Sequence, residues 1–244
     1  MVVGLGIPLQ KVETLTLGID TKRFPFQRPH LQARSGPLRL ICTRHLEAVY
    51  DQRTIITGMA ILASQRLDFR LTFVGGGSLR ERLRALAMDQ GIGDKTTFLG
   101  KVPNSHLPEL LADYDIYLSA SVSDGTSLSL LEAMASGLYP VVSDISANRA
   151  WIKHGHNGLL HKVSDPQSLA DSVLAVLRDP GQTGEALRFN RALVVSRGDR
   201  MANMNRLEEV YCKLALRHEF ASASGSPAGA VDQAASQCRV EKAD

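Results

Sequence analysis

The chain has 244 residues, of which 44% are hydrophobic, and this length and composition suit one or two globular domains with buried cores. A formal net charge of +3 at pH 7 and an aromatic content of 5% indicate neither the basic footprint nor the stacking surface of a nucleic-acid-binding protein. The three cysteines are widely spaced and fit neither a metal site nor a disulfide framework, and no run of about 18 apolar residues indicates a membrane span, so we expect a cytoplasmic protein with at most peripheral membrane contact.

Strand-like and helix-like patterns alternate from residue 38 onward. The predicted strands cover residues 38–43, 70–74, 96–99, 115–119 and 139–142. The predicted helices cover residues 53–65, the run after 78, residues 105–112, the segment around Glu132 and the stretch that opens at Asp165-Pro166. This alternation predicts an α/β, Rossmann-like fold, a parallel sheet with helices on both faces. In such sheets ligands bind at the carboxyl ends of the strands.

The segments on either side of this pattern differ from it. Residues 1–36 show no regular period and are predicted to be an interdomain segment. Two further helices are predicted at 184–195 and 199–216, within a C-terminal helical region that spans 183–218. Residues 219–244 are rich in Ala, Ser and Gly, which predicts a disordered tail. The remaining residues, 37–182, are the predicted ligand-binding domain.

One stretch carries two carboxylates beside a glycine turn. Asp124 lies in a predicted loop, Gly125-Thr126-Ser127 follows it, and Glu132 lies about one turn inside the next helix. A strand that ends in such a turn and opens a helix forms an anion site, because the first amides of the helix have no partners inside it. A phosphate there would have one carboxylate on each side, placed to accept hydrogen bonds from sugar hydroxyls. The same spacing also suits a solvated Glu132 and a turn-forming Asp124.

Two other segments could contribute to the same site. Gly75, Gly76 and Gly77 follow the strand predicted at 70–74. They would let a phosphate or a ribose approach the backbone closely, and they would equally suit a tight turn without a ligand. Arg44 follows the first predicted strand and is either a partner for a diphosphate or a surface arginine.

The order of these motifs resembles the donor-binding, C-terminal half of GT-B glycosyltransferases. Within them it is most similar to the large retaining family 4, whose hallmark is an acidic residue, seven others and then Glu. The matching segments, over about residues 15–215, are Gly18-Ile19-Asp20 with Phe24, Val74–Gly77, Phe98–Val102, Asp113–Ser119, Asp124–Gly137, Asn148-Arg149 with Trp151-Ile152, and Asn157–Leu160. The resemblance implies that residues 37–182 bind a nucleotide-sugar such as a UDP- or GDP-sugar.

The resemblance also implies a role for each site residue. Asp124 would contact the donor sugar, and Glu132 the ribose of the nucleotide. The amides of Thr126-Ser127-Leu128 would face the phosphates. Val102 stands in the segment where family members hold the base with main-chain groups, and Asn148 would approach the donor.

Three departures from the family pattern concern charged residues. The Lys that family members carry shortly after the first strand is absent, and Arg53 is the only nearby cation. Asp124 stands where most members have Glu, and Ala150 where a subset has Glu. Arg44, Asp124 and Glu132 remain the candidate catalytic residues.

The expected activity is retaining transfer of a hexose-type sugar from a nucleotide-sugar to a glycan or lipid-linked acceptor. No cofactor is expected, and Arg44 and the helix amides could meet the phosphate charge without a metal. The histidines form no metal pair at helical spacing, since His154 and His156 merely flank Gly155.

Two alternatives belong to other classes of protein. One is a non-catalytic nucleotide-sugar-binding module. Only about 35 residues precede the first core strand, fewer than an acceptor domain needs, so we expect a partner chain to supply that domain and to cover an apolar face of the helix predicted at 199–216. The other is a nicotinamide-dependent dehydrogenase, which would require a Gly-x-Gly-x-x-Gly that the first strand–helix unit lacks.

Overall fold

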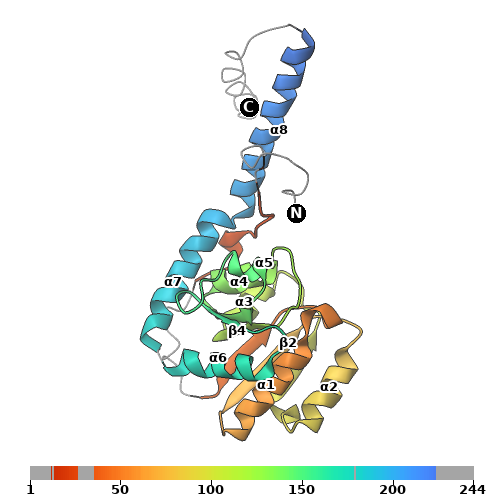
Figure 1. The fold of residues 1–244 in the computed structure, drawn as a ribbon, viewed down its shortest axis with the longest axis vertical. Helices are drawn as coiled ribbons and strands as arrows, with labels where there is room; N and C mark the ends of the chain where they lie inside the picture. Colours follow the sequence, from red (N-terminus) through yellow and green to blue (C-terminus); the bar gives the residue numbers. More distant parts are fainter. Residues whose placement is uncertain (1–11, 13, 27–35, 179, 224–244) are drawn as a thin grey trace. The chain divides into compact units, whose positions relative to one another are not determined.

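A computed structural model describes residues 12, 14–26, 36–178 and 180–223 (Figure 1). The strands are β1 (Leu38–Cys42), β2 (Phe69–Val74), β3 (Thr96–Gly100), β4 (Ile116–Ser119), β5 (Tyr139–Ser143) and β6 (Leu159–His161). The helices are α1 (Gln52–Ser64), α2 (Arg80–Asp89), α3 (Leu107–Leu111), α4 (Leu128–Ser136), α5 (Ser146–Arg149), α6 (Pro166–Arg178), α7 (Pro180–Arg197) and α8 (Arg200–Ala223). Short 3-10 turns cover Thr21–Arg23, Ala48–Tyr50 and Gly93–Lys95.

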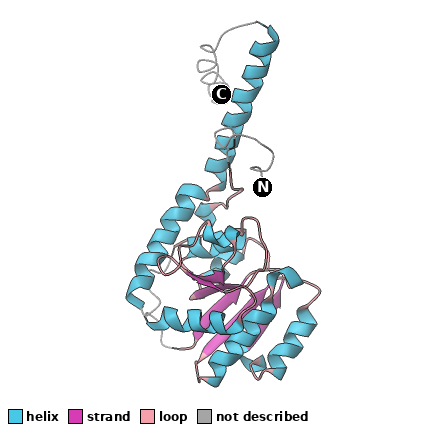
Figure 2. Ribbon diagram, viewed as in Figure 1, coloured by secondary structure: helices cyan, strands magenta, loops and turns pink. Residues whose placement is uncertain are grey.

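The six strands form one sheet in the order β3-β2-β1-β4-β5-β6, and every neighbouring pair is parallel. Figure 2 shows the strands side by side with helices around them, which confirms the predicted α/β, Rossmann-like class. After β1 the chain builds outward through β2 and β3, and it then returns to place β4 on the other side of β1. This reversal leaves a crevice at the carboxyl ends of β1 and β4, because the loops after them run to opposite sides.

The sheet separates two apolar clusters. Leu40 and Cys42 of β1 point into the cluster that includes α1, α2 and α6, whereas Ile41 points into the cluster that includes α3 and α4. This alternation follows from the period of two along a strand. Both faces of the sheet are covered, so its strands read as nearly continuous apolar runs rather than as alternating ones.

Two short elements were not predicted from the sequence. The edge strand β6 and the helix α5 are too short to show a hydrophobic period that a sequence pattern could reveal. β6 exists because Leu159, Leu160 and His161 pair with β5 across the sheet, a contact that no local pattern encodes. The other predicted strands and helices are present, with ends that differ by a few residues.

The described residues form two compact units. One comprises Ile19–Gly198 and contains the whole sheet, and it includes residues from the predicted interdomain segment. Phe24 is buried there, and Arg191 of α7 donates to the carbonyls of Thr21 and Phe24. The other unit includes α8, on which Met201 and Tyr211 are exposed. The boundaries predicted at 37–182 and 183–218 stay predictions, and the predicted tail lies outside the described residues from 224 onward.

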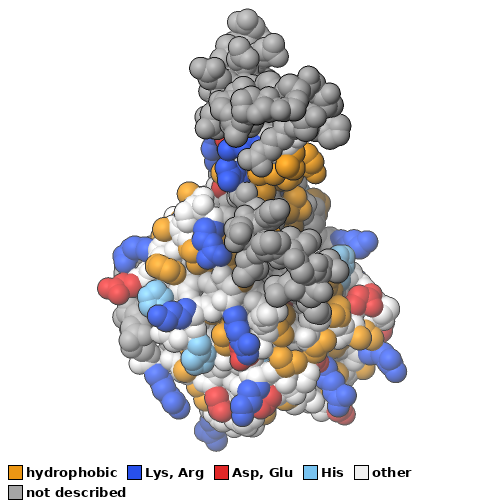
Figure 3. All heavy atoms as spheres, turned by 45° about the horizontal axis from the view of Figure 1, so that its top comes forward, with side chains coloured by type: hydrophobic (Ala, Val, Ile, Leu, Met, Phe, Trp, Pro, Cys, Tyr) orange, Lys and Arg blue, Asp and Glu red, His pale blue; other side chains and the backbone are white. Residues whose placement is uncertain are grey.

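The surface of the described residues gives two further observations. None of their helices combines the length and the apolar character that crossing a bilayer requires. On the face drawn in Figure 3, Lys and Arg side chains are spread among neutral and acidic ones rather than gathered into a stripe.

The glycine turn after β2 lies directly against the backbone after β1. Gly75 has a φ of +142°, and its amide donates to the carbonyl of Gly100 at 2.8 Å. A Cβ at Gly75 would lie 2.5 Å from the carbonyl oxygen of Arg44, and one at Gly77 would overlap the backbone of Leu46. These glycines therefore let two loops meet at the carboxyl edge of the sheet.

We expect Gly75→Ala to lower the free energy of unfolding by about 2–4 kcal/mol. The backbone φ at this position is unfavourable for Ala, and the new methyl group would clash with the carbonyl oxygen of Arg44. Urea denaturation measures the effect. Gly125→Ala is the control, since a Cβ there has no neighbour within 4 Å, and we expect a change within about 0.5 kcal/mol. Equal effects of the two substitutions would contradict this account of the turn.

Candidate functional site

Arg44 and Asp124 meet at the crevice between β1 and β4. Arg44 belongs to the loop after β1 and Asp124 to the loop after β4, and Nη2 of the arginine lies 2.5 Å from Oδ2 of the aspartate. Their side chains are only 10% and 16% exposed. Removing either partner would leave a largely buried charge without its counterion, so each side chain fixes the other.

Three further residues hold the Arg44 guanidinium. Its Nη1 donates to the hydroxyl oxygens of Ser127 and Ser129, each at 3.1 Å. Its Cζ lies 4.2 Å from the centre of the Tyr50 ring, a cation–π contact. Its Nε is buried and has no hydrogen-bond partner among the described residues. Arg44 is thus a preorganised positive charge whose Nε–H is still uncommitted.

The helix α4 begins at this cluster. Ser127 is its N-cap, and the Ser127 hydroxyl oxygen accepts a hydrogen bond from the amide of Leu130 at 3.3 Å. The first amides of α4 carry the partial positive charge of a helix N-terminus, close to that of Arg44. Gly125 and Thr126 are exposed and Leu128 is half-buried, so this end of the helix is open to a ligand.

Glu132 lies on α4, further along the helix, and is partly buried. Burial raises the pKa of its carboxyl group to about 7, and the Arg23 guanidinium partly opposes that effect. Arg23 comes from the 3-10 turn Thr21–Arg23 and also donates to the carbonyl of Asn104. A segment far from α4 in the sequence therefore contributes to the electrostatics around Glu132.

Three other predicted site residues, Val102, Arg53 and Asn148, differ in their surroundings. Val102 is half-buried against the apolar cluster that includes α3 and α4. Arg53 is exposed in the first turn of α1 and, with Val122 and other residues, lines a separate hollow of about 510 Å³. Asn148 is buried, and its Nδ2 donates to the carbonyl of Ser143 at 2.8 Å.

One Asp-x-Asp triplet, Asp113-Tyr114-Asp115, bears on the expectation that donor binding needs no metal. Its residues lie just before β4, at the amino end of the strand and therefore away from Arg44. Oδ2 of Asp115 accepts a hydrogen bond from the amide of Arg39 at 2.9 Å, and Oδ1 of Asp113 lies 3.8 Å from Nη1 of Arg39. Within the described residues no group of three or more potential metal-binding side chains occurs. Metal independence stays a prediction.

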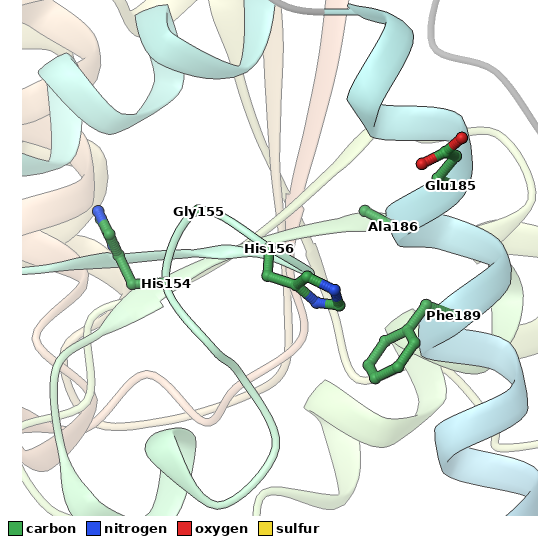
Figure 4. Close-up of a pocket in the computed structure, with 6 residues that line it drawn as sticks. All are labelled: His154, Gly155, His156, Glu185, Ala186 and Phe189. Carbon is green, nitrogen blue, oxygen red and sulfur yellow. The ribbon is translucent and has the colours of Figure 1, made fainter.

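A hollow of about 570 Å³ lies beside the loop that leads into β6 (Figure 4). His156 and Phe189 line it, with ring centres 4.9 Å apart and ring planes nearly perpendicular. His154 points away from them, and its Nδ1 accepts a hydrogen bond from the amide of Leu160 at 3.0 Å. The two histidines around Gly155 therefore do not converge on one point.

Sequence reasoning missed three members of the cluster. The hydroxyl oxygen of Ser129, like that of Ser127, accepts a hydrogen bond from Arg44, and it lies 2.8 Å from the hydroxyl oxygen of Tyr117. Burial raises the pKa of Tyr117 to about 12. The position of Ser129 two residues after the N-cap was the one available signal. Tyr50 and Tyr117 lie on distant segments and gave none.

A family model described as "Glycosyl transferases group 1" matches residues 23–214. The chain belongs to this family of glycosyltransferases. The amylovoran biosynthesis glycosyltransferase AmsK of Erwinia amylovora is 26% identical to it over 219 residues, which are 87% of this chain and 53% of AmsK. The chain spans about half the length of the curated relatives it matches.

Solved structures of glycosyltransferases share the fold. HepE of Anabaena, in complex with UDP, superposes with a TM-score of 0.73 at 18% identity, over 86% of this chain and 59% of HepE. The C-terminal domain of a group 1 glycosyltransferase, LpcC from Francisella tularensis, has a TM-score of 0.64 at 20% identity, over 74% of this chain and 98% of that domain. The described residues thus have the Rossmann-like fold of GT-B glycosyltransferase structures, as predicted.

We expect the stability of the Glu132→Gln variant to exceed that of the parent only at higher pH. The folded-state pKa of Glu132, about 7, lies above the unfolded value of 4.5, so the folded protein loses stability as the pH rises from 4.5 through 7. Gln cannot ionise, and at pH 8 it should restore on the order of 1–3 kcal/mol. Urea denaturation at pH 5 and pH 8 measures the difference. A gain that is the same at both pH values would contradict the burial of an ionised Glu132.

Proposed function

We propose that the unit Ile19–Gly198 binds the nucleotide-sugar donor of a retaining family 4 glycosyltransferase, as its C-terminal half. The observation that carries this proposal is the buried Arg44–Asp124 pair at the N-terminus of α4, at the point where the strand order reverses. A helix N-terminus beside a fixed arginine suits a diphosphate, and carboxylates next to it suit sugar hydroxyls.

Different residues of the site bind different parts of the donor. The first amides of α4, from Thr126 to Leu128, face the diphosphate. Asp124, whose direction is fixed by Arg44, accepts hydrogen bonds from the hydroxyls of a hexose-type sugar. Glu132 lies further along the helix and accepts hydrogen bonds from the ribose. The nucleotide base lies against the backbone near Val102.

The chemistry requires stabilisation of the leaving group. The bond between the sugar C1 and a diphosphate oxygen breaks, the oxygen of an acceptor hydroxyl forms the new bond on the same face of the ring, and the hydroxyl proton passes to the departing diphosphate. Negative charge grows on the diphosphate as this happens. Arg44 and the α4 amides are already oriented in the absence of substrate, so they can stabilise that charge without reorganisation.

The acceptor proposed is a growing glycan or a lipid-linked one. AmsK carries amylovoran biosynthesis in its name, and HepE was solved with UDP, which supports a polysaccharide acceptor and a uridine nucleotide. The span of about half the relatives' length favours a second candidate, a donor-binding module that works with an acceptor domain on another chain. Transfer assays with and without such a domain distinguish the two.

We expect one nucleoside diphosphate among UDP, GDP and ADP to raise the melting temperature, because a ligand that binds only the native state stabilises it. Glu132→Ala should weaken binding of that diphosphate by about 1–3 kcal/mol, the scale of a hydrogen bond to a charged group. Asp124→Ala disturbs Arg44 for both ligands, but only the sugar nucleotide also loses a hydrogen-bond partner, so its binding should weaken relative to that of the bare diphosphate. Calorimetry measures both, and equal losses for the two ligands in Asp124→Ala would contradict the division of the donor.

Donor affinity should be the same with and without EDTA, because Arg44 and the amides of α4 supply the positive charge that a metal supplies elsewhere. Isothermal titration with the sugar nucleotide before and after chelation makes the comparison. If binding required Mg²⁺ or Mn²⁺, the assignment of the phosphate-binding groups would be wrong.

A further inference from the structure

The loop that carries Asp124 leaves β4 at Ser119 and enters α4 only at Leu128. Ser119 and Ser121 are both buried at its start. A buried carbonyl needs a hydrogen-bond donor, since leaving it unpaired is costly. Both of these carbonyls find side-chain donors on the two strands beyond β4, and those donors lie outside the Arg44 cluster.

The first donor is the hydroxyl of Ser143, at the end of β5. It donates to the carbonyl of Ser121 at 2.6 Å. Asn148 of α5 in turn holds Ser143, because its Nδ2 donates to the Ser143 carbonyl at 2.8 Å. All three residues are buried, so water does not compete with these bonds.

The second donor is the imidazole of His161, at the end of β6. Its Nε2 lies 3.1 Å from the carbonyl oxygen of Ser119, and its Nδ1 lies 2.9 Å from that of Lys162. Burial lowers the pKa of His161, and an uncharged ring has a single N–H, which in the tautomer protonated on Nε2 is donated to the Ser119 carbonyl. His161 reaches across β5 to β4, and it thereby links the carboxyl ends of three strands.

The opposite side of the loop is also fixed. The amide of Val122 donates to the carbonyl of Val49 at 2.9 Å, within the 3-10 turn that also places Tyr50 against Arg44. Asp124 follows only two residues after Val122. Any shift of the loop backbone therefore moves the carboxylate that Arg44 holds.

We propose that Ser143, Asn148 and His161 are positioning residues that fix the Asp124 loop and so set the preference for a sugar nucleotide over the bare nucleoside diphosphate. The inference rests on the proposed function, in which Asp124 contacts the sugar. The three side chains act through the backbone of residues 119–122. The diphosphate binds at the start of α4, which Arg44 and the Ser127 cap also hold, so its affinity depends on these three side chains less than the sugar preference does.

The test uses Ser143→Ala and His161→Leu, each of which removes one donor. Asn190→Ala is the matched control. It removes the buried pair between Asn190 and Asn157, joined at 2.7 and 2.8 Å, near the amino end of β6. Hydrogen exchange of the Val122 amide, without ligand, reports how firmly the loop is held. Calorimetry with UDP and UDP-glucose, or with GDP and GDP-mannose where that pair binds the parent, reports the preference for the sugar.

We expect each test variant to raise Val122 exchange about tenfold and to lower the sugar preference about five- to tenfold, with a smaller loss of affinity for the diphosphate. His161→Gln, which keeps a side-chain donor, should recover part of that preference. The control should leave both quantities at the parent value. Unchanged Val122 exchange, or an unchanged sugar preference, in the two test variants overturns the inference. If the parent protein binds neither UDP with UDP-glucose nor GDP with GDP-mannose, the proposed function is wrong, and so is the inferred preference for the sugar nucleotide. The exchange data then show separately whether the side chains hold the loop.

Discussion

The site depends on one ion pair that joins two loops. Arg44 and Asp124 lie in the loops after β1 and β4, which are neighbours in the sheet but distant in the sequence, and their contact spans the crevice left by the reversal of strand order. The glycines after β2 allow the Arg44 loop to pack closely, and Ser127 places the start of α4 beneath the guanidinium. Any change in the register or position of β1 relative to β4 would separate the pair and leave two largely buried charges without their counterions.

The pair also gives the Arg44 side chain a structural role. The sequence leaves Arg44 as either a diphosphate partner or a surface arginine, whereas in the structure both terminal nitrogens already have protein partners. Its positive charge still lies next to the amides of α4, so it can act on a phosphate through the local field while it orients Asp124. An Asp at this position is one methylene shorter than Glu, and a fixed counterion gives the shorter side chain a defined direction.

The site is built at a cost to stability. A partly buried Glu132 and a buried Arg44 Nε without a partner among the described residues are each unfavourable until a ligand supplies hydrogen bonds. The buried network of Ser143, Asn148 and His161 has the opposite effect, because its hydrogen bonds stabilise a loop that lacks regular structure.

The sequence alone determined the alternating elements, the α/β class and the pair of carboxylates around the start of α4, because period, glycine turns and capping residues are local signals. It also singled out Arg44, Asp124 and Ser127, which the fold brings together. Only the tertiary structure decided that Arg53 lines a hollow together with Val122, that the triplet Asp113-Tyr114-Asp115 lies at the opposite end of β4, and that His161 reaches Ser119. These outcomes depend on the order and register of strands, which contacts between distant segments fix and no local pattern records.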